Sequence, residues 1–253
     1  MRKSEPMLNT LLRERDLDEK PDGETLDEML QRHTEVRITK PRMAQAEFLL
    51  IGTAPYMQNR FGKKAQDKME EAQKAGSQAK SKRQRAPRNF ERDYQEATHF
   101  ARAGWCGIPA GSFRAAAISA CRLVGFKMTL AKLTIFILHD DLDKVDNTPL
   151  VRIEGTRVMS KMPVRNATGV MDIRARPIWR TWRAHLRVEW DLDQFSLNDV
   201  TNLFMRVGRQ VGIGAGRPDS KDSAGIGFGL FSIQPWKGGS KGGTKQRRRR
   251  KAA

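Results

Sequence analysis

The sequence lacks most features of secreted, membrane and metal-binding proteins. Only Cys106 and Cys121 are cysteines among its 253 residues, so no disulfide framework is expected. No apolar run approaches the roughly 20 residues that span a bilayer, and the N-terminal segment MRKSEPMLNTLLRERDLDEK holds no apolar stretch of the signal-peptide type. The four histidines are scattered and no C-x-x-C pair occurs, so we expect no metal site and no cofactor. A cytoplasmic location is the simplest prediction.

Nucleotide-binding fingerprints are missing too, although residues 212–229 read GIGAGRPDSKDSAGIGFG. Neither half of this segment extends G-x-G to G-x-G-x-x-G, because Arg217 and Leu230 stand where the third glycine would be. A helix is predicted before the segment and a strand after it, which is the reverse of a phosphate loop. We therefore predict a glycine-rich loop that lets a polynucleotide strand pass close to the backbone. Its glycines are Gly212, Gly214, Gly216, Gly225, Gly227 and Gly229.

An excess of positive charge is the strongest feature of the composition. Lysine and arginine number 47 against 29 aspartates and glutamates, which gives a net charge of +18. Such a field attracts polyanions, and the clustering of the charge favours nucleic acid over a membrane surface or an acidic protein. Residues 237–253 hold eight basic residues and no acidic one, so the rest of the chain still carries +10 of the +18.

The charge pattern divides the chain into an arm, a core and a tail. Residues 1–36, with ten acidic and six basic residues, are predicted to be a weakly ordered acidic arm. Residues 37–236 form the predicted core domain, and residues 237–253 a disordered basic tail. Within the core, residues 60–97 have many charges and few large apolar side chains, which predicts a long basic insertion.

This insertion is a candidate nucleic-acid contact. Its second half is rich in basic residues, with Phe90 among them and Tyr94 shortly after them. Such a mixture of basic and aromatic side chains suits a phosphate backbone with a stacked base. A solvated insertion without a partner is the alternative. The candidate contacts in it are Lys82, Arg83, Arg85 and Arg88.

The core is predicted to be a mixed α+β domain. Residues 46–52 (AEFLLIG) and 133–140 (LTIFILHD) predict buried strands, the second of them central in its sheet. Between them, apolar residues repeat at spacings of three and four, which predicts a helix that Gly125 ends. The buried face of that helix comprises Phe113, Ala116, Ala117, Ala120, Cys121 and Val124.

Two alternating segments and a second helix follow the strand PLVRIEG. In VMDIRARPIW (170–179) Met171, Ile173 and Ala175 are expected to face inward, and in AHLRVEWD (184–191) every second residue from Ala184 to Trp190. We expect these two strands to form a hairpin across RTWR.

The end of the core shows a helix start signal and a last strand. Ser196 with Asp199 predicts a capping box, and the buried stripe of the helix is predicted to include Val200, Phe204 and Val211. The strand FGLFSIQPW (228–236) follows the glycine-rich loop. Without insertions the order is β-α-β-β-α-β, which is the ferredoxin-like or RNA-recognition arrangement.

No catalytic motif stands out, so we name no catalytic residue. A metal-independent ribonuclease needs only a general base and a general acid, and His99 or His185 could serve, although each is more often an ordinary surface histidine. The segment HDDLD (139–143) is acidic enough for a hard cation, but it follows a strand, where aspartate is a usual turn residue. We therefore expect a turn there.

Three segments together resemble the RAMP superfamily, which is built on a modified RNA-recognition fold in CRISPR effector complexes. GIPAGSFRAAAISA (107–120) is similar to the family's I-P-x-S-S-hydrophobic-[KR]-x-A segment, with Gly111 at the place of the first serine. Residues 212–229 are similar to its glycine-rich signature, and FLLIGTAPYMQNRFG (48–62) to its first strand and turn. The resemblance spans residues 47–233, is nearest to the backbone subunits that polymerise along guide RNA, and extends to proteins of bacteriophages and prophages.

The resemblance implies a groove for single-stranded RNA beside the helix after Ile108-Pro109. Ser112 and Arg114 would contact phosphate there, with a plain N-cap as the alternative role of Ser112. In the centre of the glycine-rich loop, Arg217 and Lys221 are further candidate phosphate ligands. Three further arginines are predicted on outward strand faces: Arg174, Arg176 and Arg187. They form either a basic patch that contacts nucleic acid or an ordinary solvated strand face.

We therefore expect a non-enzymatic protein that binds single-stranded nucleic acid, RNA in preference to single-stranded DNA. It would coat a strand as a homo-oligomer or as a subunit of a larger nucleoprotein complex, in the bacterial cytoplasm or an infected host cell. A metal-independent endoribonuclease of the same superfamily and a basic viral structural or scaffold protein are the alternatives.

Overall fold

The computed structural model describes residues 39–60, 89–165, 171–220 and 225–236. Contacts divide the chain into Met1–Pro41 and Arg42–Ala253, and the elements described below belong to the second unit. The predicted acidic arm, the basic tail and residues 61–88 of the predicted insertion lie outside the described residues.

The larger of two antiparallel sheets has seven strands. Along the sheet the order is β10-β1-β9-β6-β3, while β4 pairs with β9 and β5 with β6. The strands are β1 (Met43–Gly52), β3 (Gly107–Pro109), β4 (Ile135–Leu138), β5 (Asp141–Leu142), β6 (Pro149–Glu154), β9 (Arg183–Asp191) and β10 (Phe231–Pro235). The alternation predicted for β9 is confirmed, since Ala184, Leu186, Val188 and Trp190 are all buried.

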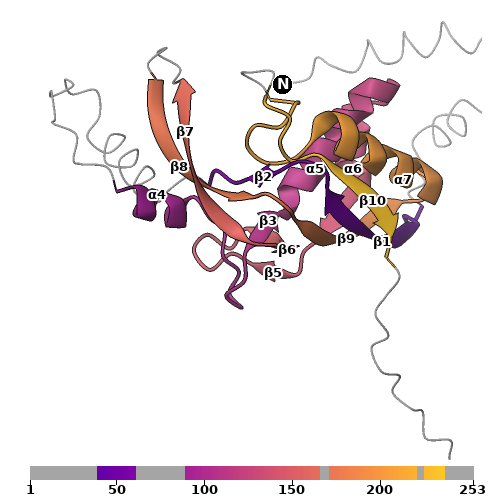
Figure 1. Ribbon diagram of the computed structural model, residues 1–253. Coiled ribbons are helices and arrows are strands. Elements are labelled where there is room, and N and C mark those ends of the chain that lie inside the picture. The colour runs from indigo at the N-terminus through magenta and orange to yellow at the C-terminus, as the bar shows by residue number, and fades with distance from the viewer. Residues whose placement is uncertain (1–38, 61–88, 166–170, 221–224, 237–253) are drawn as a thin grey trace, which may run out of the picture. The chain divides into compact units, whose positions relative to one another are not determined.

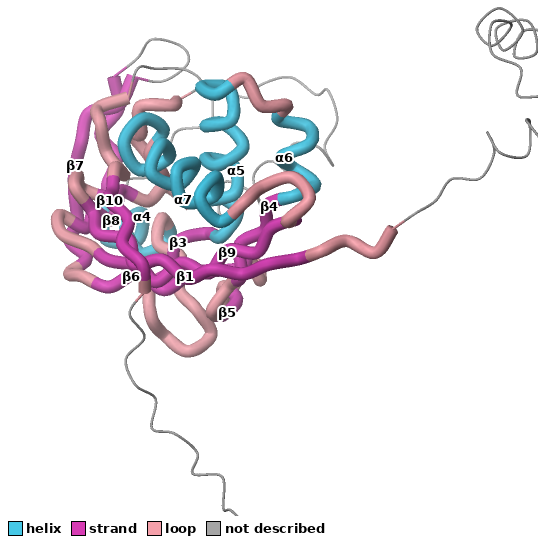
Figure 2. Tube along the Cα trace, turned by 90° about the vertical axis from the view of Figure 1, so that its right-hand side faces the viewer, coloured by secondary structure: helices cyan, strands magenta, loops and turns pink. Residues whose placement is uncertain are grey.

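The helices lie together on one face of this sheet (Figure 2). They are α5 (Ala110–Ala120) with the short η1 (Cys121–Val124), α6 (Met128–Thr134) and α7 (Leu197–Arg206) with η2 (Val207–Val211). The predicted capping box is confirmed, because the Ser196 hydroxyl accepts from the Asp199 N–H and the Asp199 carboxylate accepts from the Ser196 N–H. Gly125 ends η1 in the left-handed conformation, as predicted. Both helical stripes therefore close the core as expected, except that Val124 is exposed.

A smaller three-stranded sheet has the order β2-β8-β7. Its strands are β2 (Tyr56–Met57), β7 (Arg157–Arg165) and β8 (Met171–Trp179), and the β7–β8 pair projects away from the larger sheet as an arm (Figure 1). The short helix α4 (Phe90–Glu96) packs against β8. Met171 and Ile173, predicted to face inward, are exposed on this arm, while Ala175 is buried.

The predicted hairpin between 170–179 and 184–191 is wrong. β8 pairs with β7 and β2, while β9 pairs with β1, β4 and β6. The connection between them is anchored elsewhere, because the Trp182 indole donates to the Ala54 carbonyl at 2.9 Å and the Gly52 N–H donates to the Trp182 carbonyl. Trp182 is buried, so the connecting residues carry the chain from one sheet into the other instead of folding back.

The molecule is a mixed α+β protein with antiparallel sheets, as predicted for its class. The strand predicted at 133–140 is shorter, because its first residues complete α6 and Leu133 points to solvent. The prediction that it is central is wrong, because among the described strands β4 pairs with β9 alone. None of the described helices is long and apolar enough to cross a membrane.

Candidate nucleic-acid cleft

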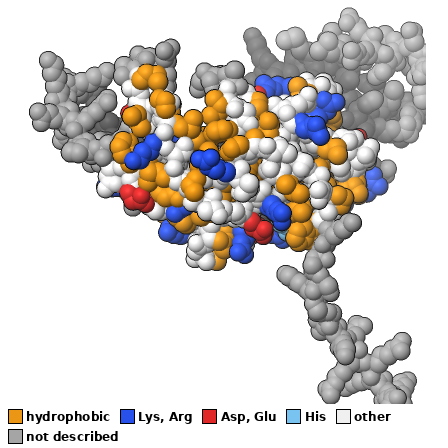
Figure 3. Space-filling model, viewed as in Figure 1, with side chains coloured by type: hydrophobic (Ala, Val, Ile, Leu, Met, Phe, Trp, Pro, Cys, Tyr) orange, Lys and Arg blue, Asp and Glu red, His pale blue; other side chains and the backbone are white. Residues whose placement is uncertain are grey.

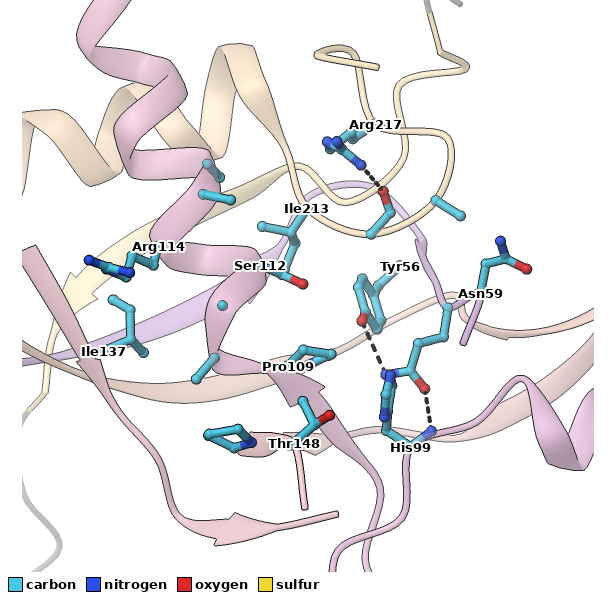
Figure 4. Close-up of a pocket in the computed structure, with 18 of the residues that line it drawn as sticks. Tyr56, Asn59, His99, Pro109, Ser112, Arg114, Ile137, Thr148, Ile213 and Arg217 are labelled. Carbon is cyan, nitrogen blue, oxygen red and sulfur yellow. Dashed lines mark hydrogen bonds between the residues drawn. The ribbon is translucent and has the colours of Figure 1, made fainter. Parts of the chain in front are cut away.

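A cleft of about 770 Å³ lies where the start of α5 meets the glycine-rich loop and β2. The residues after β4 and before β6 complete its wall, and His99 and Gln58 lie at its floor (Figure 4). Its lining mixes small residues, such as Ala110, Gly111 and Ala215, with a few polar side chains. We refer to this cavity as the cleft.

The first turn of α5 is open toward the cleft. Pro109 is the N-cap and supplies no side-chain hydrogen bond, so no side chain caps the amide groups of this end. A Cβ added to Gly111 would have no atom within 4 Å, which leaves free space beside the turn. Ser112 belongs to the helix and is not its N-cap, so the plain N-cap alternative is wrong, and its hydroxyl points toward the cleft (Figure 4).

The glycine-rich loop forms the opposite wall. All six predicted glycines have φ between 69° and 78°, a conformation that favours glycine. The loop is held against β2, because the Ala215 N–H donates to the Met57 carbonyl and the Gly214 Cα lies too close to that carbonyl for a Cβ. The two glycine groups also meet, since the Ile213 N–H donates to the Gly229 carbonyl at 3.1 Å. Most of these glycines therefore serve the packing of the loop itself.

Two polar side chains of this loop reach the cleft lining. Arg217 donates from Nη1 to the Gly214 carbonyl at 3.0 Å, which curls its side chain over the loop (Figure 4). Asp219 accepts from the Ser119 hydroxyl and pairs with Arg122 at 2.6 Å. These hydrogen bonds, that of Ser119 first, hold the pKa of the Asp219 carboxyl below its ordinary value. Asp219 thus ties the loop to the end of α5.

The floor is a buried polar network around His99. The His99 ring Nδ1 lies 2.8 Å from Asp143 Oδ2, and the Gln58 carboxamide accepts from the His99 N–H at 3.0 Å. Burial lowers the pKa of His99, although the Asp143 carboxylate opposes that shift. Asp143 is fully buried and His99 nearly so, so the expectation of a surface histidine at position 99 is wrong. The HDDLD segment likewise contains strand β5 and this buried aspartate where only a turn was expected.

The carboxylates on this floor also have a cationic partner. His99, Asp143 and Asp146 bring one ligand atom each within 4.8 Å of the others, which resembles a metal-binding group. However, Arg60 Nη2 lies 3.4 Å from Asp143 and 2.9 Å from Asp146. The guanidinium therefore supplies the positive charge that the two carboxylates require, and the cluster functions as an ion-pair network.

The structure brings three of the predicted contacts to the cleft: Ser112, Arg114 and Arg217. The Arg114 guanidinium is tied to the Ile135 carbonyl at 3.0 Å and to the Lys132 carbonyl, and it lies over the Phe136 ring. Those contacts leave Ser112 and Arg217 as the predicted side chains best placed to meet a ligand.

The other predicted contacts lie elsewhere. Arg174 and Arg176 are on β8 of the arm, and Arg174 lies 3.6 Å from Asp172. Arg187 is on β9, where it pairs with Asp140 at 3.1 Å. Lys82, Arg83, Arg85, Arg88 and Lys221 lie outside the described residues.

Tyr94 is not available to stack on a base, contrary to expectation. It is buried in α4, and the Arg157 guanidinium covers its ring at 4.5 Å. Phe90 is likewise covered by Lys161 at 5.0 Å. These rings anchor α4 to the arm. The prediction that they stack on bases depended only on their position in a basic segment.

No protein-family model matches this chain, and no curated protein matches it either. The sequence analysis gave no individual role to Tyr56, Gln58 and Asp219, whose polar contacts shape the floor and the loop, and it took Asp143 for a turn residue.

Proposed function

We propose that the protein binds single-stranded nucleic acid, RNA in preference to single-stranded DNA, along the cleft. The observation that carries this proposal is the convergence of the open α5 N-terminus, the Ser112 hydroxyl and Arg217 on one cavity. Amide groups at a helix start, a hydroxyl and a guanidinium are all phosphate ligands. A phosphodiester backbone is their best common partner in a chain with a net charge of +18.

Surface charge supports a polyanionic ligand. Figure 3 shows basic side chains spread across the face seen in Figure 1, with few acidic side chains between them. In the cleft, residues with small side chains such as Gly111 and Ala215 let a strand approach the protein backbone.

The strand order supports the RNA-recognition arrangement. In chain order β1, α5, β4, β9, α7 and β10 form a β-α-β-β-α-β series, and β10, β1, β9 and β4 are successive neighbours in the sheet. On this basis, and because the segment from Ile108 resembles the I-P segment of the RAMP superfamily, we propose a RAMP-like fold. Coating of a strand as a multimer, in a CRISPR-effector-like or phage nucleoprotein assembly, belongs to the same proposal.

The test is binding of labelled oligonucleotides measured by fluorescence anisotropy. Single-stranded RNA should bind most tightly, and the affinity should fall by about 0.7 log units per neutralised phosphate for each tenfold rise in salt. Arg217→Ala should weaken binding several-fold, whereas Arg206→Ala, an exposed arginine on α7, is the matched control. A shallow salt slope with no effect of Arg217→Ala would reject the cleft, and equal affinity for duplexes would favour a basic scaffold protein.

A metal-independent endoribonuclease is the second candidate, because His99 lies at the floor of the cleft. Its Nδ1 faces Asp143, so Nε2 is the nitrogen left to accept a proton from a 2′-hydroxyl. His185, the other nominated histidine, is on the opposite face of the sheet and cannot act in the cleft. Cleavage of single-stranded RNA in the presence of a chelator, lost in His99→Gln but kept in His185→Ala, would establish this activity.

A further inference from the structure

The face of the large sheet opposite the helices is not covered by any described helix (Figure 2). The register of β1 with β9 places Glu47, Leu49 and Ile51 on this face, opposite Arg187, His185 and Arg183. The helix-facing residues of the same strands, such as Leu50 and Ala184, are buried in the core. This open face is therefore a separate surface, and none of these open-face residues lines the cleft.

A stacked aromatic pair lies on this open face. The rings of His185 and Trp236 have centroids 4.3 Å apart and planes 27° from parallel. Because β1 lies between β10 and β9, the Trp236 side chain must reach across β1 to meet His185. The Trp236 N–H donates to the Glu47 carbonyl at 3.2 Å, and His185 Nε2 lies 3.0 Å from the Glu47 carboxylate. The Glu47 carboxylate thus holds the His185 ring, and the Glu47 carbonyl fixes the backbone of Trp236 from which the indole extends.

Trp236 is the tryptophan most accessible to a partner. It is 38% exposed, whereas Trp179, Trp182 and Trp190 are at most 3% exposed. Arg183, two residues before His185 on the same face of β9, is exposed and forms no ion pair with another described residue. We call Trp236, His185 and Arg183 the sheet-face platform. In the register of this face His185 lies between Trp236 and Arg183. An exposed indole is a ring on which bases of single strands stack, and a guanidinium is a phosphate ligand.

The chain that follows the platform favours a polyanion as its partner. Trp236 is directly followed by KGGSKGGTKQRRRRKAA, which holds eight basic residues and no acidic one. Acidic side chains also lie on the open face, since Glu47 contacts His185, Glu154 stands opposite Arg183, and Glu189 and Asp191 follow on β9. The eight positive charges of the following segment outnumber these four acidic residues. An acidic peptide would match the charge, but a nucleic acid also presents a flat ring with every phosphate, which favours it as the partner of an exposed indole.

We propose that the sheet-face platform is a second contact site for single-stranded nucleic acid. A base stacks on the exposed Trp236 indole, and Arg183 contacts a phosphate of the same strand. The proposal shares the ligand class of the proposed function but uses none of the cleft residues. The protein then contacts a strand at two places, on opposite faces of the large sheet.

Photo-crosslinking on the full chain tests this site. A single-stranded oligonucleotide that carries 5-iodouracil should crosslink to the peptide containing Trp236, and it should still do so in Arg217→Ala. Trp236→Ala should abolish that crosslink and weaken binding about tenfold. Trp236→Phe should weaken binding less, because a ring remains. The control is Trp105→Phe, which changes a half-buried tryptophan elsewhere and should leave binding unchanged. Reduced affinity in Trp236→Ala without an effect of Arg217→Ala would uphold the platform and reject the cleft. Unchanged affinity in Trp236→Ala, or crosslinks confined to cleft peptides, would overturn the platform.

Discussion

In the glycine-rich loop, Asp219 Oδ1 lies 2.6 Å from Nη2 of Arg122, which belongs to η1 directly after α5. The Ser119 hydroxyl donates to the other carboxylate oxygen, so two residues of one helical segment hold the loop. The same loop is fixed at its other end by the Ala215 N–H, which donates to β2. Arg217, two residues before Asp219, is therefore positioned by contacts on both sides of it.

Asp219→Ala should loosen the loop without unfolding the protein. Because the pair is partly exposed, we expect a loss of only about 0.5–1.5 kcal/mol in the free energy of unfolding. Binding of a single-stranded oligonucleotide should weaken, since Arg217 loses its position. The control is Asp193→Ala, which removes a comparably exposed ion pair with Arg42. Equal loss of affinity in both variants would mean that Asp219 does not position the cleft.

His99 should make stability depend on pH below neutrality. Burial lowers its pKa from the ordinary value of 6.5, so the unfolded chain binds its proton more readily than the folded chain. The free energy of unfolding should therefore be highest above about pH 6.5 and decrease as the pH falls toward the lowered pKa. Urea denaturation at about pH 7.5 and about pH 5.5 measures this slope. His99→Gln should reduce it, and an unchanged slope in that variant would contradict this origin of the pH dependence.

Gly229 and Gly227 offer a matched pair of substitutions. Both have a φ above 70°, but a Cβ on Gly229 would lie 1.8 Å from the Ile213 carbonyl oxygen, while a Cβ on Gly227 would meet nothing within 4 Å. Gly227→Ala should cost about 1–2 kcal/mol for the left-handed backbone alone. Gly229→Ala should cost clearly more, because backbone must also move. Thermal unfolding of the two variants measures the difference, and equal melting temperatures would contradict this packing of the loop.

Local patterns in the sequence predicted the elements better than their partners. The period of two in β9 and the Ser196 capping box depend on neighbouring residues, and both are confirmed. The pairing of β8 was predicted wrongly, because an alternating strand does not reveal which strand it joins. The contact that decides it, Trp182 with Ala54, spans 128 positions.

In the cleft, too, local motifs were predictable from the sequence and long-range contacts were not. The segment around Ser112 and the glycine-rich loop were recognisable by residue type and spacing, and the structure brings them to one cavity. The pairing of His99 with Asp143 spans 44 positions, and neither residue carries a local signal for burial. Arg60 was similarly unmarked, although it is the cation that allows Asp143 and Asp146 to lie so close together. Long-range polar contacts of this kind require the fold itself.

Arg176 offers a test that separates stability from binding on the arm. Its Nε is buried and has no hydrogen-bond partner among the described residues, and burial and the nearby Arg174 lower the pKa of its guanidinium. An unsatisfied buried donor is costly, so Arg176→Met should leave the melting temperature unchanged or raise it. If Arg176 contacts phosphate as the sequence suggested, the same variant should bind single-stranded RNA more weakly. A stable variant with unchanged affinity would show that this arginine is not a contact. A destabilised variant would show that the side chain contributes packing that methionine does not replace.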